Sequence, residues 1–274
     1  MPGQHGRCGG LRTRGYGKTS CSDRPVVTVV TVVLNDAAGL QKTIASVTSQ
    51  TYDTIELIII DGSSSDATLE VIRGCEDRID FWISEPDRGI YDAMNKGIDL
   101  AAGAWINFLN CGDCFYRADT VETVFRSSCA DADFIYGDTF FLSGDFHGVV
   151  KAWDFSQLWK TMIFTHQSLF TRAEILKNRK FDTSFRICAD FDIIFSSYMQ
   201  GRTFHYADTV IAMFDPGYSD INRALMAIEK WRVVRRFRSD VRFHLFYAGL
   251  VLRRFFHDLL KRRQQRRARQ RKGA

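Results

Sequence analysis

Uninterrupted runs of apolar residues predict buried strands in the first part of the chain. Residues 26–34 read VVTVVTVVL and residues 55–60 read IELIII, and shorter apolar stretches occupy residues 79–84 and 104–110. Runs rich in β-branched residues are typical of strands that are covered on both faces of a parallel sheet. We therefore predict four buried strands in this part of the chain.

The segments between these strands have the pattern of amphipathic helices. Apolar residues recur at helical spacing in each connection: Leu40, Ile44 and Val47, then Leu69 and Ile72, then Ile90, Met94 and Ile98. Strands that alternate with helices form a parallel sheet with helices on both faces. Residues 26–115 are therefore expected to form a doubly wound α/β sheet.

The pattern is more mixed beyond residue 116. We expect a helix over residues 120–127, a hairpin of aromatic strands over residues 133–153, a helix over residues 189–200 and two short strands within residues 203–214. From residue 222 onward the pattern is helical. The predicted fold is α/β, with a mostly parallel sheet, a smaller mixed region and a helical C-terminal extension.

Charge is distributed unevenly along the chain. The net charge is +5, but residues 230–274 hold 16 Lys and Arg against two Asp, which leaves about −9 for the remainder. Arginines alternate there with large apolar residues such as Trp231, Phe243 and Phe255. A basic helix with an apolar face lies flat on anionic lipid. The tail is thus expected to bind a membrane surface, with packing on the domain or homodimerisation as alternatives. Nucleic-acid binding is not expected, because no aromatic stacking platform accompanies the charge.

Cysteine usage and the N-terminus favour a cytoplasmic location. The seven cysteines follow no spaced framework, which is typical of a reducing compartment. Residues 1–24 are rich in Gly and Arg and contain no apolar signal segment, so we expect a disordered arm. No run reaches the roughly 18 apolar residues of a spanning helix. We expect a protein on the inner face of the cell membrane.

Polar residues follow each of the four predicted strands. These segments are Asn35-Asp36, residues 61–64 (DGSS), residues 85–88 (EPDR) and residues 110–113 (NCGD). Ligands of doubly wound sheets bind beyond the carboxyl ends of the strands. The four segments therefore predict a binding site at one edge of the sheet. Asp61 can alternatively serve as a turn residue before the next helix.

The segment FLNCGDCF, residues 108–115, has two incompatible interpretations. Cys111 and Cys114 form a Cys-x-x-Cys pair, which is a redox or zinc motif in other contexts. Zinc would need two more soft ligands, and a redox pair is expected after the first strand of a small domain. Asp113 instead offers a hard oxygen ligand where a diphosphate would lie. We favour the carboxylate interpretation.

Several segments, taken in order, resemble one enzyme family. VVTVVTVVLND, IELIIIDGSSSD, SEPDRGIYDAMNKGIDLAAGAWINFLNCGD, THQSLF and ADFDIIF look like family 2 glycosyltransferases with a GT-A fold, most similar to the bacterial colanic-acid and exopolysaccharide type. The resemblance implies an inverting transfer of sugar from a nucleotide-diphosphate donor to a lipid-linked or polysaccharide acceptor. It divides residues 25–220 into a donor half (25–115) and an acceptor half (116–220), followed by the basic tail (221–274).

The resemblance also implies roles for individual residues. Asp61 matches the nucleobase contact, and the segment Asn110 to Asp113 matches the metal-binding region for Mn²⁺ or Mg²⁺, with Asn110 and Gly112 where two acids often stand. Asn35 joins the donor site, and Arg88 or Lys96 supplies a phosphate-binding charge. His166 and Gln167 match a pair near the phosphates or the acceptor. Asp190 matches the catalytic base, which must take the proton of the acceptor hydroxyl, with Asp192 as a competing candidate.

Two other functions fit the sequence less well. A sugar-phosphate nucleotidyltransferase would need a glycine-rich basic loop after the first strand, and LNDAAGLQ, residues 34–41, has no such character. A non-catalytic membrane-binding or nucleic-acid-binding module would depend on the basic ends alone. The enzyme hypothesis predicts that residues 25–220 still act on a nucleotide sugar.

Overall fold

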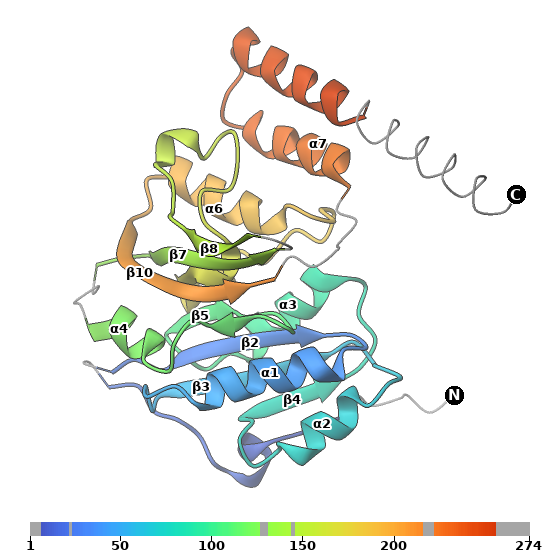
Figure 1. Ribbon diagram of the computed structural model, residues 1–274, viewed down its shortest axis with the longest axis vertical. Helices are drawn as coiled ribbons and strands as arrows, with labels where there is room; N and C mark the ends of the chain where they lie inside the picture. Colours follow the sequence, from blue (N-terminus) through green and yellow to red (C-terminus); the bar gives the residue numbers. More distant parts are fainter. Residues whose placement is uncertain (1–6, 22–23, 127–130, 144–145, 216–221, 256–274) are drawn as a thin grey trace, which may run out of the picture. The chain divides into compact units, whose positions relative to one another are not determined.

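A computed structural model provides the structure of the chain (Figure 1). It describes residues 7–21, 24–126, 131–143, 146–215 and 222–255. The chain divides into two compact units: residues 1–183 with 201–217 form the first, and residues 184–200 with 218–274 form the second. All strands that the structure describes belong to the first unit.

Four parallel strands form the centre of the first unit. They are β2 (Val27–Val33), β3 (Ile55–Asp61), β4 (Phe81–Ser84) and β5 (Trp105–Phe108), in the spatial order β4-β3-β2-β5. Every residue of β2 and β3 is buried. This burial on both faces explains the unbroken apolar runs, and it confirms the four predicted strands.

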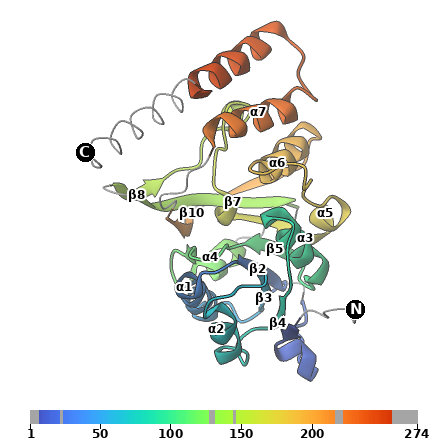
Figure 2. The same cartoon turned by 90° about the vertical axis from the view of Figure 1, so that its right-hand side faces the viewer.

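Helices cover both faces of this sheet (Figure 2). One face carries α1 (Ala37–Thr48), α2 (Thr68–Gly74) and α4 (Thr120–Arg126), and the other carries α3 (Ile90–Leu100) and α5 (Ala173–Asn178). This arrangement confirms the doubly wound fold expected from the alternation of strands and helices.

The predicted apolar faces of the helices are buried or partly buried, with one exception. Leu40, Ile44 and Val47 of α1 are all buried, as is Met94 of α3. Ile90 is 47% exposed. It is the first residue of α3, so it lies at the rim of the sheet beyond the strand that the rest of the helix covers.

The second half of the first unit extends the sheet with mixed strands. β9 (Leu169–Arg172) pairs antiparallel with β5 and with β7 (Phe134–Ser143), which forms the predicted hairpin with β8 (Phe146–Val150). β10 (Phe204–Phe214) runs parallel to β7 and antiparallel to β6 (Cys114–Phe115).

One strand replaces the two that were predicted within residues 203–214. The pairing of β10 with β7 shifts register between Tyr206 and Val210. Asp208, inside this shift, has φ of 40°. A bulge of this kind interrupts the apolar alternation without ending the strand, and it therefore looks like a boundary in the sequence.

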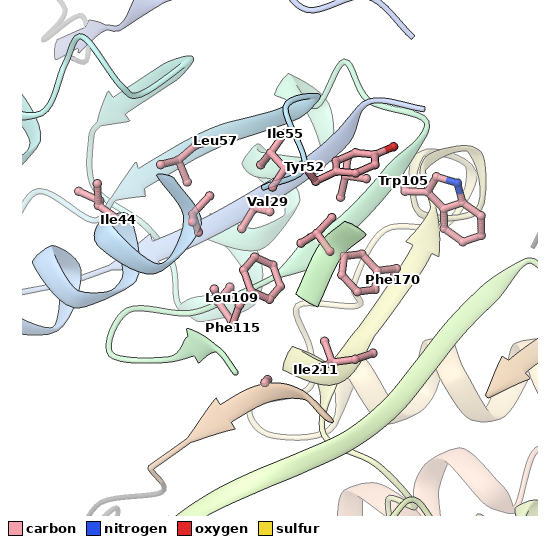
Figure 3. Close-up of a cluster of buried hydrophobic side chains, with 14 of the residues drawn as sticks. Val29, Ile44, Tyr52, Ile55, Leu57, Trp105, Leu109, Phe115, Phe170 and Ile211 are labelled. Atoms are coloured by element: carbon pink, nitrogen blue, oxygen red, sulfur yellow. The ribbon is translucent and has the colours of Figure 1, made fainter. Parts of the chain in front are cut away.

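Apolar side chains from the central strands, α1 and the mixed region form one core (Figure 3). Aromatic residues are prominent in it: the rings of Phe115 and Phe170 stack with centroids 6.3 Å apart, and Trp105 meets Phe125 edge-on at 5.6 Å. Ile211 of β10 belongs to the same cluster. The core therefore joins the parallel strands and the mixed strands into one rigid support.

Residues 7–21 of the N-terminal arm are ordered, whereas the sequence predicted a disordered arm. β1 (Arg7–Gly9) pairs antiparallel with β4. Nη1 of Arg12 lies 3.1 Å from the Glu56 carboxylate, and Nζ of Lys18 lies 2.9 Å from that of Asp80. Both carboxylates are almost fully buried, and buried charges require partners. The arm is ordered because it neutralises them. Residues 1–6 lie outside the described residues.

The second unit is helical. It contains α6 (Ala189–Met199), α7 (Arg223–Val234) and a helix that the structure describes over residues 241–255. Phe195 of α6 meets Phe237 edge-on, with ring centroids 5.8 Å apart. The helical extension predicted from residue 222 is thus present, and α6 groups with it. Residues 256–274 of the predicted tail lie outside the described residues.

Among the described helices, none has the length and apolar character needed to cross a membrane.

Candidate active site

The strand order reverses between β2 and β5. β3 and β4 lie on one side of β2, and β5 lies on the other. In open α/β sheets, ligands bind beyond the carboxyl ends of the strands at such a point. Asn35 and Asp36 follow β2, and residues 110–113 follow β5. Two of the four polar segments are therefore neighbours at the reversal point, and Asp61 lies one strand further along the same edge.

Hydrogen bonds to Thr43 of α1 fix the loop that follows β5. The hydroxyl of Thr43 accepts a hydrogen bond from the N–H of Gly112 at 3.0 Å and donates to the carbonyl of Asp113 at 2.8 Å. Gly112 has φ of 92°, a left-handed conformation that favours glycine. These bonds fix the turn that presents the side chains of Asn110 and Asp113.

The structure brings the Asn-Cys-Gly-Asp segment together with the His-Gln pair. Nε2 of Gln167 donates to Oδ2 of Asp113 at 2.8 Å. Nδ2 of Asn110 lies 3.0 Å from Nε2 of His166. Nδ2 of Asn107, on β5, contacts the carbonyl oxygen of Gln167 at 2.9 Å and so anchors the pair to the sheet. Two segments more than 50 residues apart therefore form one polar cluster.

Asp113 lies in an environment that disfavours its negative charge. The residue is only 5% exposed. Burial raises the pKa of Asp113 to about 6, although the hydrogen bond from Gln167 and the nearby His166 act in the opposite direction. A bound cation would compensate the loss of hydration that causes this shift.

Asn110 supplies a second oxygen that fits a cation. Its Oδ1 is buried and has no hydrogen-bond donor among the described residues. A carboxylate and an amide carbonyl are hard oxygen ligands of the kind that Mg²⁺ and Mn²⁺ accept. In the described part of the chain no three His, Cys, Asp or Glu side chains cluster as a metal site. The remaining ligands would have to be phosphate oxygens and water.

Asp61 is buried at the end of β3 and already has several partners. Its carboxylate accepts hydrogen bonds from the N–H and hydroxyl of Ser64 and from the hydroxyl of Ser84, the last at 2.6 Å. It therefore fixes the turn after β3, as the turn interpretation predicted. Ser63, within that turn, has φ of 68°.

Asn35 ties the turn after β2 to the turn after β3. Its side-chain oxygen accepts a hydrogen bond from the N–H of Ser65 at 2.8 Å, and its own N–H donates to the hydroxyl of Ser64 at 2.8 Å. Asn35 also has a left-handed backbone, with φ of 54°. Strained residues of this kind concentrate at ligand-binding sites. Asn35 is exposed at the edge where a ligand is expected.

The two candidate phosphate-binding cations differ in their surroundings. Lys96 is largely enclosed, with Nζ 2.8 Å from Glu85 and also paired with Asp87. Arg88 has an 86% exposed side chain and pairs only with Asp92 among the ion pairs described, at 2.8 Å. Lys96 therefore orders the segment after β4, whereas Arg88 is accessible to a ligand.

The two candidate bases lie at the start of α6 in the second unit. Asp190 is partly exposed. Asp192 is 3% exposed, and its Oδ1 lies 2.8 Å from Nη1 of Arg236. Its burial and its contact with Arg236 leave little of the Asp192 carboxylate accessible to an acceptor hydroxyl. The surroundings of the two residues favour Asp190.

Comparison with models of protein families identifies the family to which the chain belongs. The family model described as glycosyl transferase family 2 matches residues 28–199, which is more than half of the chain. The chain belongs to this family. It is therefore a glycosyltransferase, as the resemblance implied.

Curated relatives of this family 2 glycosyltransferase are themselves named glycosyltransferases. The PGL/p-HBAD biosynthesis glycosyltransferase of Mycobacterium bovis is 32% identical over 174 residues, which cover 61% of this chain and 68% of the relative. An uncharacterized glycosyltransferase of Mycobacterium tuberculosis is 47% identical over 98 residues, which cover 35% of this chain and 37% of the relative.

Solved structures confirm the GT-A fold of this family 2 glycosyltransferase. S. aureus TarS in complex with UDP-GlcNAc has a TM-score of 0.61 at 12% identity, covering 84% of this chain and 72% of that chain. The mannosyltransferase PcManGT of Pyrobaculum calidifontis, in complex with GDP-Man and Mn²⁺, has a TM-score of 0.60 at 19% identity. The match covers 85% of this chain and 70% of that chain.

The thiols of Cys111 and Cys114, beside Asp113 in this family 2 glycosyltransferase, lie in surroundings that disfavour the thiolate form. Burial, with the charge of Asp36, raises the pKa of Cys111, and burial raises that of Cys114. Sγ of Cys111 lies 3.3 Å from the carbonyl oxygen of Asp36, and Sγ of Cys114 lies 3.8 Å from that of Lys42. A nucleophile or metal ligand requires a thiolate, which these surroundings disfavour.

Replacing both cysteines with serine is expected to be nearly silent. The double variant Cys111→Ser with Cys114→Ser should keep donor binding and turnover within about twofold, because the serine hydroxyls can make the same contacts to backbone carbonyls. The measurement is donor turnover beside a thermal melt. A well-folded double variant without activity would restore the thiol interpretation.

Several residues that build the site were not predicted from the sequence. Thr43, Asn107 and Ser84 lie inside a helix or a strand, and their contacts join segments far apart in the chain. The only available signal was polarity within apolar runs, as for Asn107 in AWINFLN. Polarity at a buried position indicates a hydrogen-bond partner without identifying it.

Proposed function

We propose that this enzyme transfers a sugar, with inversion, from a nucleotide-diphosphate sugar to a hydroxyl group of a lipid-linked or polysaccharide acceptor in envelope or exopolysaccharide synthesis. The observation that carries the proposal is the cluster of Asn110, Asp113, His166 and Gln167 at the reversal point of the sheet. Solved relatives in complex with UDP-GlcNAc and with GDP-Man support the choice of donor class.

The donor would lie along the carboxyl edge of β3, β2 and β5. Strands are about 4.8 Å apart, so the ends of β3 and β5 are separated by about 10 Å, the scale of a nucleoside diphosphate. The nucleoside would meet the turns that Asp61 and Asn35 order, and the diphosphate would reach Asp113. Arg88 is the accessible cation for the phosphates.

We assign a divalent cation, Mn²⁺ or Mg²⁺, to the oxygens of Asp113 and Asn110. A cation there neutralises charge on a departing diphosphate when it is bound. Only one of the two ligands is charged, so the affinity of the cation should depend strongly on the diphosphate. The complex of PcManGT with GDP-Man and Mn²⁺ supports a metal in this fold.

Asp190 is assigned as the general base. In an inverting transfer, the acceptor oxygen forms a bond to the anomeric carbon while the bond from that carbon to the diphosphate oxygen breaks on the opposite face. The acceptor proton moves to the Asp190 carboxylate during this attack. The accessibility of Asp190, compared with the buried ion pair of Asp192, supports this choice.

A donor screen tests the proposal. Thermal melts of the full chain are recorded with UDP-, GDP- and dTDP-sugars, UDP-GlcNAc and GDP-mannose among them, each with and without Mn²⁺ or Mg²⁺. One nucleotide class should raise the melting temperature, and more so with the cation, because a ligand that binds only the folded state stabilises it. No shift with any donor at millimolar concentration would contradict the proposal.

The helix over residues 241–255 supports a membrane-bound acceptor. Val241, Leu245, Leu252 and Phe255 share one face of this helix at helical spacing, and their side chains are 56–72% exposed. The opposite face packs inward, where Tyr247 stacks on Trp231 of α7 with ring centroids 6.4 Å apart.

Basic residues lie beside this exposed apolar face. Arg242 and Arg253 are exposed on the same helix, and residues 256–274 add further Lys and Arg to the sequence. An apolar helical face flanked by cations binds anionic lipid interfaces. We therefore assign the enzyme to the cytoplasmic face of the membrane, beside a lipid-linked acceptor.

Removing the apolar face should weaken membrane binding. Leu245→Ser with Leu252→Ser is expected to lower co-sedimentation with phosphatidylglycerol vesicles at least about tenfold, because each buried leucine contributes about 2 kcal/mol. Ile228→Ser, which changes an exposed residue of α7 outside this face, is the matched control. Unchanged vesicle binding, or a loss of self-association in its place, would contradict the assignment and favour a homodimer.

A further inference from the structure

Glu229 of α7 is a buried carboxylate with an unusual set of partners. Its side chain accepts hydrogen bonds from three consecutive backbone N–H groups: Arg186 at 2.8 Å, Ile187 at 2.9 Å and Cys188 at 3.0 Å. The residue is 5% exposed. Charge-assisted bonds to backbone N–H groups are stronger than bonds between neutral groups. Glu229 therefore holds this backbone segment firmly.

The segment that Glu229 holds leads directly into the proposed base. Cys188 is the N-cap residue of α6 and provides no side-chain cap, and Asp190 is the second residue of the helix. The first N–H groups of a helix lack partners within the helix itself. Fixing the backbone of residues 186–188 sets the direction in which α6 starts, and with it the position of the Asp190 carboxylate.

Two further residues of the same C-terminal segment contact the first turn of α6 itself. Nζ of Lys230 lies 5.3 Å from the ring centroid of Phe191, the residue after Asp190. Nη1 of Arg236 lies 2.8 Å from Oδ1 of Asp192. Three side chains from residues 229–236 therefore contact the backbone before α6 and the first turn of that helix.

We propose that Glu229 is a positioning residue for the catalytic carboxylate, so that α7 is part of the catalytic machinery rather than of a separable tail. The inference rests on the proposed role of Asp190. It differs from the sequence-based division at residue 220, which predicts activity without the C-terminal helices. A carboxylate displaced by about 1 Å can lower the rate by about 10²-fold.

The test uses Glu229→Gln in the full chain. Glutamine has the shape of glutamate but only one accepting oxygen, so it cannot satisfy all three N–H groups. We expect kcat for nucleoside diphosphate release from the donor selected in the screen, with water as acceptor, to fall at least about tenfold, with KM for the donor within about twofold. Asp240→Ala is the matched control, because Asp240 caps the helix of residues 241–255 through Phe243 N–H at 3.1 Å. It should lower the melting temperature and leave kcat unchanged.

A double-mutant cycle with Asp190→Asn separates positioning from general destabilisation. If Glu229 acts through Asp190, Glu229→Gln lowers kcat at least about tenfold in the native background and less than about twofold in the Asp190→Asn background. Equal losses in both backgrounds, or no loss in the native background, would overturn the positioning role. An Asp190→Asn variant with full activity would instead contradict the base assignment, so the two failures are distinguishable.

Discussion

Asp190→Asn is expected to lower the rate of sugar transfer by about 10²–10⁴-fold while donor affinity stays unchanged. Asparagine has nearly the same shape as aspartate but cannot accept the proton of the acceptor hydroxyl. The thermal shift caused by the nucleotide sugar should therefore persist, and only turnover should be lost. Steady-state kinetics and donor thermal shifts of the same preparation provide the two measurements.

Asp192→Asn provides the comparison that separates the two candidate bases. Asp192 is buried and paired with Arg236, so its replacement leaves a cation without its partner. We expect a lowered melting temperature, with turnover per folded molecule less affected than in the Asp190 variant. The reverse pattern, an active Asp190→Asn enzyme and a well-folded but inactive Asp192→Asn enzyme, would reassign the base.

Asp113→Asn should abolish the metal-dependent part of the donor thermal shift and lower turnover by about 10²-fold or more. The variant keeps the shape of the side chain and an oxygen that can accept the Gln167 hydrogen bond. It removes the only negative charge in the pair of oxygens assigned to the cation. The comparison is the thermal shift with and without Mn²⁺ for the native and variant chains.

Asp133→Asn is the matched control for that experiment. Asp133 directly precedes β7, which runs parallel to β5, so it lies at the opposite edge of the sheet, where it pairs with Arg202 at 3.3 Å. Its replacement should leave the metal-dependent shift intact. A metal-dependent shift that survives in Asp113→Asn would show that the cation is held elsewhere.

The central strands were predictable because their burial leaves a local signal. β2 and β3 are covered on both faces, and their sequences are therefore almost entirely apolar. β1 has no such signal, since it lies at the edge of the sheet in a segment rich in Gly and Arg. Its order depends on long-range ion pairs such as Arg12 with Glu56, which no local pattern encodes.

The site was predictable in position but not in its internal contacts. The parallel topology alone brings Asn35, Asp61 and Asp113 to one edge, and family resemblance selected His166 and Gln167. Neither source predicted that Gln167 would donate to Asp113, because that bond depends on the antiparallel pairing of β9 with β5. Glu229 left no signal at all, since its partners are backbone N–H groups more than 40 residues away.

Anomalous scattering from Mn²⁺ in a crystal of the full chain, grown with a nucleoside diphosphate sugar, would locate the cation and the donor in one experiment. We predict a manganese peak at coordination distance from the Asp113 carboxylate, with the diphosphate at the carboxyl ends of β2 and β5 and Asp190 facing the anomeric carbon. A nucleotide bound away from this edge, or an Asp190 carboxylate directed away from the sugar, would refute the proposed active site.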